Sequence, residues 1–293
     1  MRTLDLDALE MFRAVATRGG VIRAAQFLCR VPSNVSTRIK QLEARLGVAL
    51  FERQGRGLAL TAEGRLLLDY AERLLQLGDE AVAAVTSGQP LGIFRLGAME
   101  STAGARLPPL LARYHAAVPA VRVELQTGTS GALIARLLRH EIDAAFVAEP
   151  YSAPGLTGQD VFEEELVLIS ERGRPPVRAP GDLGRATLLA FAAGCAYRRV
   201  LEDWLASGGC LPGRVLEFAS YPAIVACVAG GTGVALVPRS VLLSLRAGDE
   251  VQAHHLPPAI AYQRTRLLWH PGRASLALSA FRPLLPVLAE RGT

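Results

Sequence analysis

Residues 30–48, RVPSNVSTRIKQLEARLGV, restrict the fold of this chain more than any other stretch. Val35, Ile39, Leu42 and Leu46 recur at spacings of four, three and four, which places them on one face of an α-helix. The opposite face carries mostly small hydrogen-bonding side chains: Ser33, Asn34, Thr37, Lys40, Gln41 and Ala44. A purely solvated face would be rich in Glu, Lys and Arg. The helix is therefore expected to pack one side on a core and to present the other to a partner.

Two shorter helices are expected before it. Apolar residues at positions 6, 9, 12 and 16 mark the first, which ends at Gly19 and Gly20, and the second is VIRAAQFL at 21–28. Two short helices, a tight connection and a third helix with a polar outer face are the pattern of a helix-turn-helix. Residues 49–61, ALFERQGRGLALT, predict a β-hairpin with a glycine-rich turn, the wing of a winged helix.

The positive charge of the chain is concentrated in this region. Residues 1–62 carry ten Lys and Arg against five Asp and Glu, whereas residues 63–293 carry twenty-two of each. A localised basic region is typical of a domain that binds nucleic acid, although an excess of this size also occurs on ordinary surfaces.

One long helix is expected from Thr61, its predicted N-cap, to about Ser87. Leu67, Tyr70, Leu74, Leu77 and Ala81 follow the a/d rhythm of a coiled coil, which predicts pairing with a second copy. The alternative is that this stripe packs on the chain's own domain. Residues 87–92, SGQPLG, are expected to form a hinge.

Strand-like and helix-like segments alternate from residue 93 onward. This alternation predicts an α/β architecture with largely parallel sheets, and about 200 residues suffice for two small lobes with a cleft between them. The last predicted helix covers residues 275–290.

Five stretches of the sequence carry a resemblance to a known family. AAQFL, NVSTRIKQLEARLGVALFER and LALTAEGRLLL resemble the DNA-binding domain and linker helix of LysR-type transcriptional regulators, and GTSGALIARLLRHEIDAAFV and VACVAGGTGVALVP resemble later segments of that family. The resemblance covers essentially the whole chain. It implies a homodimer, commonly a homotetramer, that binds double-stranded promoter DNA and responds to a small effector, with RNA polymerase as a further candidate partner.

The expected fold is a winged helix-turn-helix domain at 1–60, a linker and dimerisation helix at 61–88, and a regulatory domain at 89–293. The family implies that this last domain has the two-lobed α/β fold of type 2 periplasmic binding proteins. Lobe I is expected at about 93–162 and 265–293, and lobe II at about 163–264.

The DNA contacts are assigned from the chemistry of the side chains. Short or planar hydrogen-bonding groups read base edges, and cations neutralise phosphates. Asn34 and Thr37 are expected at base edges. Phosphates or groove edges are expected to be contacted by Ser33, Ser36, Arg38 and Lys40, and the DNA backbone or minor groove by Arg53 and Arg56 of the wing. Ser33 alternatively caps the helix.

The sequence departs from the family's commonest pattern beside these residues. The usual Ser-Gln-Pro-Ala is replaced by Val31-Pro32-Ser33-Asn34, and the usual Arg-Gln by Thr37-Arg38. The glutamine that often reads bases is absent, so the preferred half-site is expected to differ.

Effector contacts are expected where strands lead into helices, because free N–H groups at helix N-termini favour anions. By position and by resemblance, these contacts are Ser101, Thr102, Thr129, Ser130, Phe146, Cys195, Tyr197, Arg198 and Tyr221. Arg198 is expected to hold a carboxylate, which suggests a small organic acid or an amino-acid-like effector. The alternative for the Ser and Thr residues is helix capping.

Other functions agree less well with the sequence than an effector-controlled DNA-binding regulator does. No G-x-S-x-G, H-E-x-x-H or P-loop occurs, which argues against an enzyme on an α/β scaffold. A redox sensor using Cys195 and Cys210 is an alternative source of the signal. No metal or cofactor is expected, and His254-His255 is assigned to a polar loop. No membrane-spanning run or signal peptide is apparent, so a cytoplasmic protein is expected.

Overall fold

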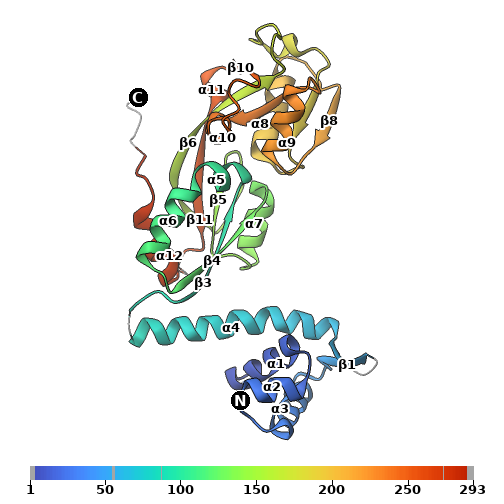
Figure 1. Ribbon diagram of the computed structural model, residues 1–293, viewed down its shortest axis with the longest axis vertical. Helices are drawn as coiled ribbons and strands as arrows, with labels where there is room; N and C mark the ends of the chain where they lie inside the picture. The colour runs from blue at the N-terminus through green and yellow to red at the C-terminus, as the bar shows by residue number, and fades with distance from the viewer. Residues whose placement is uncertain (1–3, 55–56, 87, 273, 289–293) are drawn as a thin grey trace. The chain divides into compact units, whose positions relative to one another are not determined.

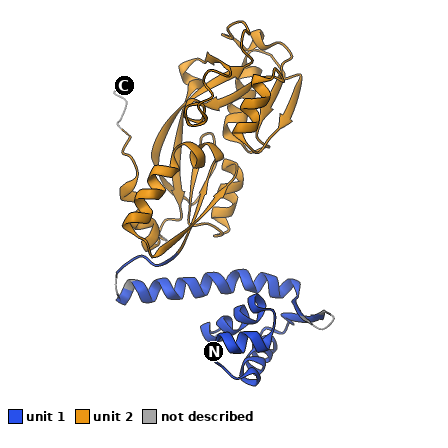
Figure 2. Cartoon of the chain, in the orientation of Figure 1, with its two compact units in different colours: residues 1–92 blue, residues 93–293 orange. Residues whose placement is uncertain are grey.

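The computed structural model describes residues 4–54, 57–86, 88–272 and 274–288. The chain divides into two compact units, residues 1–92 and 93–293 (Figures 1 and 2). Unit 1 contains α1 (Leu6–Arg18), α2 (Val21–Phe27), α3 (Pro32–Leu46), β1 (Phe51–Gln54), β2 (Gly57–Leu60) and α4 (Ala62–Thr86). The expected order of three helices, a hairpin and a long helix is confirmed.

The apolar stripe of α3 forms part of the core of unit 1. Val35, Ile39 and Leu42 are buried against α1 and α2, and Leu46 is half-buried. Pro32 begins the helix, where its missing N–H costs no hydrogen bond, and Gly47 ends it in the left-handed conformation with φ 72°. The stripe predicted from the spacing is therefore confirmed, and its orientation fixes the opposite face toward solvent.

The wing is an antiparallel hairpin in which Phe51 pairs with Leu60 and Arg53 with Leu58. Phe51 packs on Phe12 of α1 with ring centroids 5.4 Å apart, which attaches the hairpin to the helical core.

Helix α4 spans 25 residues, so it is about 37 Å long. The Thr61 hydroxyl accepts a hydrogen bond from the Gly64 N–H at 2.9 Å, which confirms its predicted capping role. A Cβ at Gly64 would lie 2.1 Å from the Leu50 carbonyl oxygen, so only glycine permits this close approach. Ala71 and Leu75 are buried in the core of unit 1, which contains α1.

Unit 2 is built on a seven-stranded sheet with the order β10-β6-β11-β5-β3-β4, and β9 also pairs with β6 (Figure 1). These strands are β3 (Gly92–Ala98), β4 (Val121–Thr127), β5 (Ala144–Ala148), β6 (Thr157–Ser170), β9 (Ala235–Pro238), β10 (Gln252–His255) and β11 (Tyr262–Trp269). A separate pair consists of β7 (Thr187–Ala190) and β8 (Arg214–Glu217).

The helices of unit 2 are α5 (Glu100–Ala105), α6 (Leu107–Ala117), α7 (Ser130–Leu138), α8 (Ala196–Ser207), α9 (Tyr221–Ala229), α10 (Arg239–Leu245), α11 (Pro258–Ala261) and α12 (Leu276–Phe281). Two short 3₁₀ helices lie at Pro180–Leu183 and Arg282–Leu284. Within the described part of the chain, no helix is both long and apolar enough to cross a membrane.

The prediction of largely parallel sheets is wrong. β3 pairs in parallel with β5 and β7 with β8, but β11 is antiparallel to both β5 and β6, and β9 and β10 are antiparallel to β6. The long strand β6 is the reason. Its residues 157–165 pair with β11, and residues 166–169 pair with β9. The chain leaves the region of β3, β4 and β5 through β6 and returns through β11, so these neighbouring strands run in opposite directions.

We call the part around β3, β4 and β5 lobe I and the part around β7 to β10 lobe II. Lobe I has a core of aromatic side chains, including Phe94, Tyr114 and Phe281. A second core contains Leu133 and Ile134 of lobe I together with Leu188 of lobe II. The two lobes thus share buried apolar surface. The lobe boundaries expected from the sequence stay a prediction.

Three further expectations differ from the structure. The last helix ends at Phe281 and not at 290, because Pro283 and Pro286 cannot continue an α-helix. His254 and His255 lie on β10 and not in a loop. Helices α5, α10 and α11 and strand β10 were not expected. All are short, with four to seven residues, and such elements carry little periodicity.

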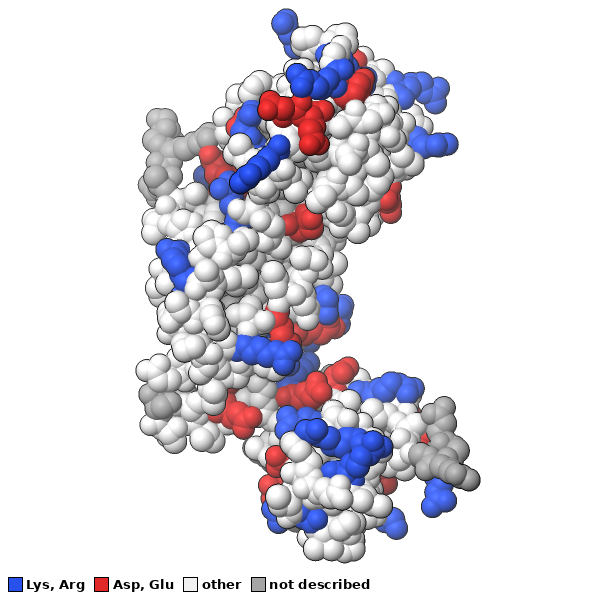
Figure 3. Space-filling view, in the orientation of Figure 1, with Lys and Arg blue, Asp and Glu red and all other residues white. Residues whose placement is uncertain are grey.

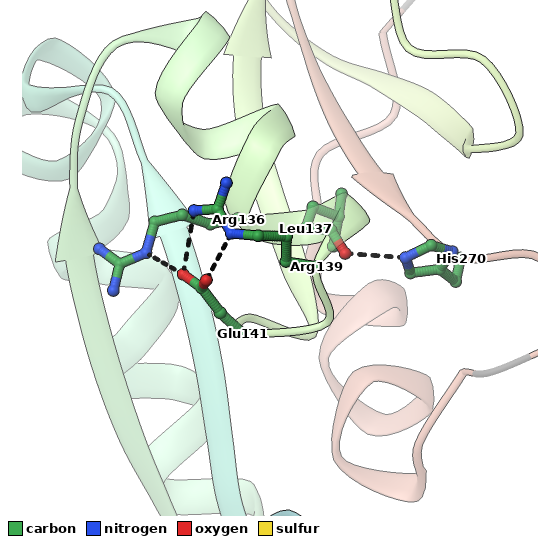
Figure 4. A network of polar contacts seen from close by, with 5 residues as sticks. All are labelled: Arg136, Leu137, Arg139, Glu141 and His270. Carbon is green, nitrogen blue, oxygen red and sulfur yellow. Dashed lines mark hydrogen bonds and ion pairs between the residues drawn. The ribbon is translucent and has the colours of Figure 1, made fainter. Parts of the chain in front are cut away.

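The C-terminal end of α7 is fixed by a polar network (Figure 4). His140 adopts the left-handed conformation with φ 58°, and the Glu141 carboxylate accepts from Arg139 at 2.6 Å and from Arg136 at 3.1 Å. His270 Nε2 donates to the Leu137 carbonyl at 2.8 Å. This cap anchors α7, whose other end contributes to the site described below.

Candidate functional site

The outer face of α3 is the first candidate site. Ser33, Asn34, Thr37 and Lys40 are all exposed on the side opposite the buried stripe. No side chain caps the N-terminus of α3, so the alternative capping role of Ser33 is not observed. Exposed hydroxyl, amide and ammonium groups on a helix that protrudes from a small core match the requirements for contact with a nucleic-acid groove. In Figure 3, several Lys and Arg side chains gather on the visible face of unit 1.

Arg38 lies on the flank of this face and is held by the protein itself. Its Nη2 donates to Asp5 Oδ1 at 3.1 Å, and Arg45 Nη1 donates to Asp5 Oδ2 at 3.3 Å. Asp5 is also the N-cap of α1, where it accepts the Ala8 N–H at 2.9 Å. The Ala8 N–H, followed by the charges of Arg38 and Arg45, lowers the pKa of Asp5. Arg38 therefore ties α3 to α1, with its side chain one-third exposed.

The remaining predicted DNA contacts are Ser36 on α3 and the two wing residues, Arg53 and Arg56. Ser36 is half-buried on the other flank of α3, and Arg53 is exposed on β1, one residue from the end of the strand. Arg56 lies outside the described residues.

The long helix α4 presents an exposed apolar stripe. Of the predicted pairing residues, Tyr70, Leu74 and Leu77 are 52%, 38% and 61% exposed, Ala81 is exposed, and Leu67 is partly buried on the core of unit 1. Leu66 and Val85, which were not predicted as pairing residues, are 61% and 87% exposed. Leu66 lies four residues before Tyr70, and Val85 lies four residues after Ala81, so both continue the same stripe. They could have been predicted by extending the helical spacing at each end.

The second candidate site is a pocket in unit 2 where four helices begin. Residues 99–101 lead from β3 into α5, residues 128–130 from β4 into α7, and residues 195–197 open α8. Phe191 and Tyr221, the first residue of α9, complete the lining. The pocket has a volume of about 270 Å³ including its open mouth. Helix starts from both lobes thus meet at one cavity, as the sequence reasoning expected.

The predicted hydroxyl contacts are largely engaged within the protein. Thr129 Oγ1 accepts from the Ala132 N–H at 3.3 Å and caps α7. Ser130 Oγ accepts from the Ala148 N–H at 3.2 Å and is 3.3 Å from the Ala148 carbonyl oxygen. Thr129 and Ser130 line the pocket as predicted, and at Thr129 the capping role also holds.

Two predicted contacts lie elsewhere. Phe146 is fully buried in the core of lobe I, where it packs on Phe162 and Phe281, so its prediction as a pocket wall is wrong. The reason is that successive side chains of β5 point to opposite faces, and Phe146 faces away from the pocket. Thr102 is also buried and does not line the pocket, although its neighbour Ser101 does.

Arg198 and Cys195 lie at the start of α8. Arg198 donates to Glu202 Oε1 at 2.8 Å and to Glu217 Oε1 at 2.6 Å, so its charge is already neutralised. It lines an adjoining open cleft of about 1060 Å³, which shares Ser130 and Cys195 with the pocket. Burial raises the pKa of the Cys195 thiol, which disfavours the reactive thiolate.

Glu100 is a pocket residue that the sequence reasoning missed. Burial raises the pKa of its carboxyl, and the nearby backbone N–H of Tyr221 at the start of α9 offsets part of that rise. The position could have been found from the sequence, because Glu100 stands at the same strand-to-helix turn as Ser101 and acidic residues are frequent in first helical turns. Phe191 was also missed, and no sequence pattern distinguishes it from a core residue.

Tyr197 brings a second unusual feature to the pocket. The residue is 2% exposed, and its hydroxyl has no hydrogen-bond partner among the described residues. Ser101 and Thr265 lie close to this hydroxyl without completing a hydrogen bond of good geometry. Burial is the main cause of the raised pKa values of Tyr197 and Tyr221, so both phenols stay neutral.

Two ion pairs lie where β6 passes between the lobes. Glu164 accepts from Arg106 Nε at 2.7 Å and from Ser240 Oγ at 2.7 Å. The adjacent Glu165 pairs with Arg239 at 2.6 Å, and this arginine lowers the pKa of Glu165. Because Arg106 belongs to lobe I and Ser240 to α10 of lobe II, Glu164 links the two lobes.

Comparisons with known proteins match both units. The profile of the bacterial regulatory helix-turn-helix proteins of the lysR family matches residues 6–65, and the profile of the LysR substrate binding domain matches residues 87–286. The uncharacterized HTH-type transcriptional regulator YusT of Bacillus subtilis (strain 168) is 39% identical over 266 residues, covering 90% of this chain and 89% of that protein.

Another relative and a solved structure agree with these matches. The HTH-type transcriptional regulator GltR of Bacillus subtilis (strain 168) is 35% identical over 280 residues, covering 95% of both chains. Full-length CbnR in complex with its target DNA has a similar structure, with a TM-score of 0.68 and 23% identity over 96% of this chain and 99% of that one. The last likeness shows that the fold is shared.

Proposed function

The chain belongs to the LysR family of bacterial transcriptional regulators, and from this premise we propose that it reads its operator with α3 and the wing, pairs through α4, and senses a small metabolite in the pocket of unit 2. The family assignment makes it a DNA-binding regulator with an effector-binding domain and not an enzyme. The observation that carries the proposal is the division of α3 into a buried apolar stripe and an exposed polar face.

In the proposed complex, α3 enters the major groove. Asn34 and Thr37 read base edges, while Ser33, Ser36 and Lys40 contact phosphates or groove edges. Arg53 and Arg56 of the wing contact the DNA backbone or the minor groove. Arg38 contributes to positioning through Asp5, and its exposed third remains available to a phosphate. CbnR, which was solved with its target DNA, supports this use of the shared fold.

The proposed dimer is held by α4. Isolated apolar side chains are normal on surfaces, but a stripe of Leu66, Tyr70, Leu74, Leu77 and Val85 along one helix face would favour association. Burying this stripe against a second copy removes it from water, and two copies then match a palindromic operator. A tetramer and a contact with RNA polymerase are part of the same proposal, as is location in the cytoplasm.

The proposed signal is a small organic acid or an amino-acid-like metabolite. The pocket lies between two lobes at the carboxyl ends of strands, where α/β folds bind ligands. Binding that favours one angle between the lobes would alter how the two DNA-binding units are presented.

The rival signal is oxidation of Cys195 with Cys210. These residues precede and follow α8, whose twelve residues span about 18 Å. A disulfide needs Cα atoms within about 7 Å, so α8 would have to unfold. Operator binding that is unchanged by peroxide, in the wild type and in Cys195→Ser, is the expected result.

Genome-wide mapping of bound sites tests the proposal directly. We expect discrete palindromic sites upstream of genes, and the neighbouring genes point to the metabolite. Uniform, sequence-independent occupancy would contradict operator recognition by α3. A thermal-shift screen of the metabolites made or used by those genes then tests the effector pocket.

A further inference from the structure

We infer that Glu100 determines the ligand specificity of the pocket and that it selects an effector carrying a protonated amino group. This inference rests on the proposed effector-binding function of unit 2. It narrows the chemical class of the effector, because a simple anion would meet the Glu100 carboxylate and be repelled.

The first step is the position of Glu100. Glu100, the first residue of α5, lines the pocket together with Tyr221, the first residue of α9, and its carboxyl lies near the Tyr221 backbone N–H. In the part of the chain that the structure describes, no Arg, Lys or His forms an ion pair with Glu100, although ion pairs hold other acidic residues such as Glu164 and Glu217. A half-buried carboxylate without a cation is costly, and an incoming cation relieves that cost.

The second step is the character of the walls. The rings of Phe191 and Tyr221 lie with centroids 4.8 Å apart, and Tyr197 also lines the cavity. A carboxylate among aromatic rings is the typical environment that binds an ammonium group, because ring faces attract cations.

The third step is the buried Tyr197 hydroxyl, which lacks a hydrogen-bond partner among the described residues. A buried polar group without a partner is rare in folded proteins, and a ligand is one way to satisfy it. An ammonium group has three N–H donors and no acceptor. It can therefore donate both to Glu100 and to the Tyr197 oxygen.

The fourth step is the room for the rest of the ligand. The pocket has a volume of only about 270 Å³, whereas the adjoining cleft has about 1060 Å³, both including their open mouths. A compact amino group fits the pocket, and the remainder of the molecule extends past Ser130 and Cys195 into the cleft. Arg198 and Arg199 line that cleft, although acidic partners neutralise both.

The inference is tested by calorimetric titration of the full-length protein with a matched series of small probes: butylamine, 4-aminobutyrate and butyrate. Each probe is titrated into the wild type, Glu100→Gln and the control Asp249→Asn, which removes an exposed carboxylate that does not line the pocket. Glutamine has nearly the size and shape of glutamate and keeps a carbonyl oxygen at this position, so the fold is expected to be retained.

The wild type and Asp249→Asn should bind both amines at least about ten-fold more tightly than butyrate. Glu100→Gln should lose about ten-fold in affinity for the amines and should bind butyrate more tightly than the wild type. Butyrate binding to the wild type as tightly as the amines, amine affinity unchanged in Glu100→Gln, or no amine binding at all would overturn the inference.

Operator binding by the same samples, measured by gel shift, keeps this outcome separate from the proposed function. A wild-type protein that binds its operator and responds to butyrate but not to the amines would contradict only the role of Glu100. A protein that does not bind any genomic site would contradict the proposed function instead.

Discussion

Arg38 of α3 lies 3.1 Å from Asp5, the residue that caps α1. One carboxylate thus caps the first helix and positions the third, which carries the proposed base-reading residues. This contact joins residues 33 positions apart in the sequence and links the stability of the helix-turn-helix to the orientation of its outer face.

Substitution of Asp5 tests this link. Asp5→Ala removes both the cap and the acceptor of two arginines, and we expect the domain to lose about 1–2 kcal/mol of stability, mostly through the cap. The exposed ion pairs add little. Asp5→Asn keeps a capping oxygen and should lose less. Denaturant unfolding of the full-length protein measures the loss of stability. Titration with operator DNA then measures the effect on DNA binding. Equal losses for the two variants would mean that charge and not capping dominates.

Substitutions on α3 and on the wing should have different effects on DNA binding: the first should alter sequence preference, and the second should weaken binding to every sequence. Asn34→Ala should cost about 1–3 kcal/mol on the preferred operator and should relax the preference at one base pair. Arg53→Ala should weaken binding to all sequences alike and should reduce the salt slope by about one. Fluorescence anisotropy against a set of operator variants, at several salt concentrations, separates the two patterns. An equal loss from Asn34→Ala on every variant would count against base readout.

The stripe on α4 should control dimerisation. Leu77→Lys places a charge in the middle of the exposed stripe and should shift the dimer toward monomer, because a buried ammonium without a partner is strongly unfavourable. Asp79→Lys introduces the same side chain in the same turn but away from the stripe, so it is the control. Light scattering coupled to gel filtration gives the mass. A dimer that survives Leu77→Lys at low concentration would place the interface elsewhere.

The buried His254 predicts a pH dependence of stability. Its Nδ1 accepts the Val177 N–H at 3.1 Å, so Nε2 carries the proton and donates to Ser170 Oγ at 2.9 Å. Burial is the main cause of its lowered pKa, with Arg174 as a second cause. The unfolded chain therefore binds a proton more readily than the folded one, and stability should fall as the pH drops below about 6.5.

One such group changes the free energy of unfolding by at most about 1.4 kcal/mol per pH unit. The melting temperature of the wild type should therefore decrease between neutral pH and pH 5. In His254→Gln the overall stability should be lower, because the Val177 contact is disturbed, but the pH dependence should be flatter. Parallel melting curves for the two proteins across this range would show that other groups cause the effect.

Much of unit 1 was predictable, because its pattern is local. The stripe on α3, the cap at Thr61, the pairing of β1 with β2 and the long helix all follow from spacings within a few residues of one another. Each spacing maps directly onto a helix face or a turn, so the sequence is enough to place it.

The pocket of unit 2 was predictable only in part. Ser101, Thr129 and Tyr197 were found because strand-to-helix turns can be recognised along the chain. Phe146 was misplaced because the face of β5 that meets the pocket depends on how its neighbours pack. The position of Glu100 could be recognised from its strand-to-helix turn, but its proximity to Tyr221, 121 positions later, could not.

The sequence by itself therefore determined which segments are helices with a buried and an exposed face, and it identified the family through those segments. Only the tertiary structure decided that β11 returns antiparallel beside β6, that Arg38 is held by Asp5, and that Glu100 faces aromatic side chains from the other lobe. The physical reason is that periodicity records the environment of each segment, whereas contacts between distant segments depend on how their buried faces pack together in three dimensions.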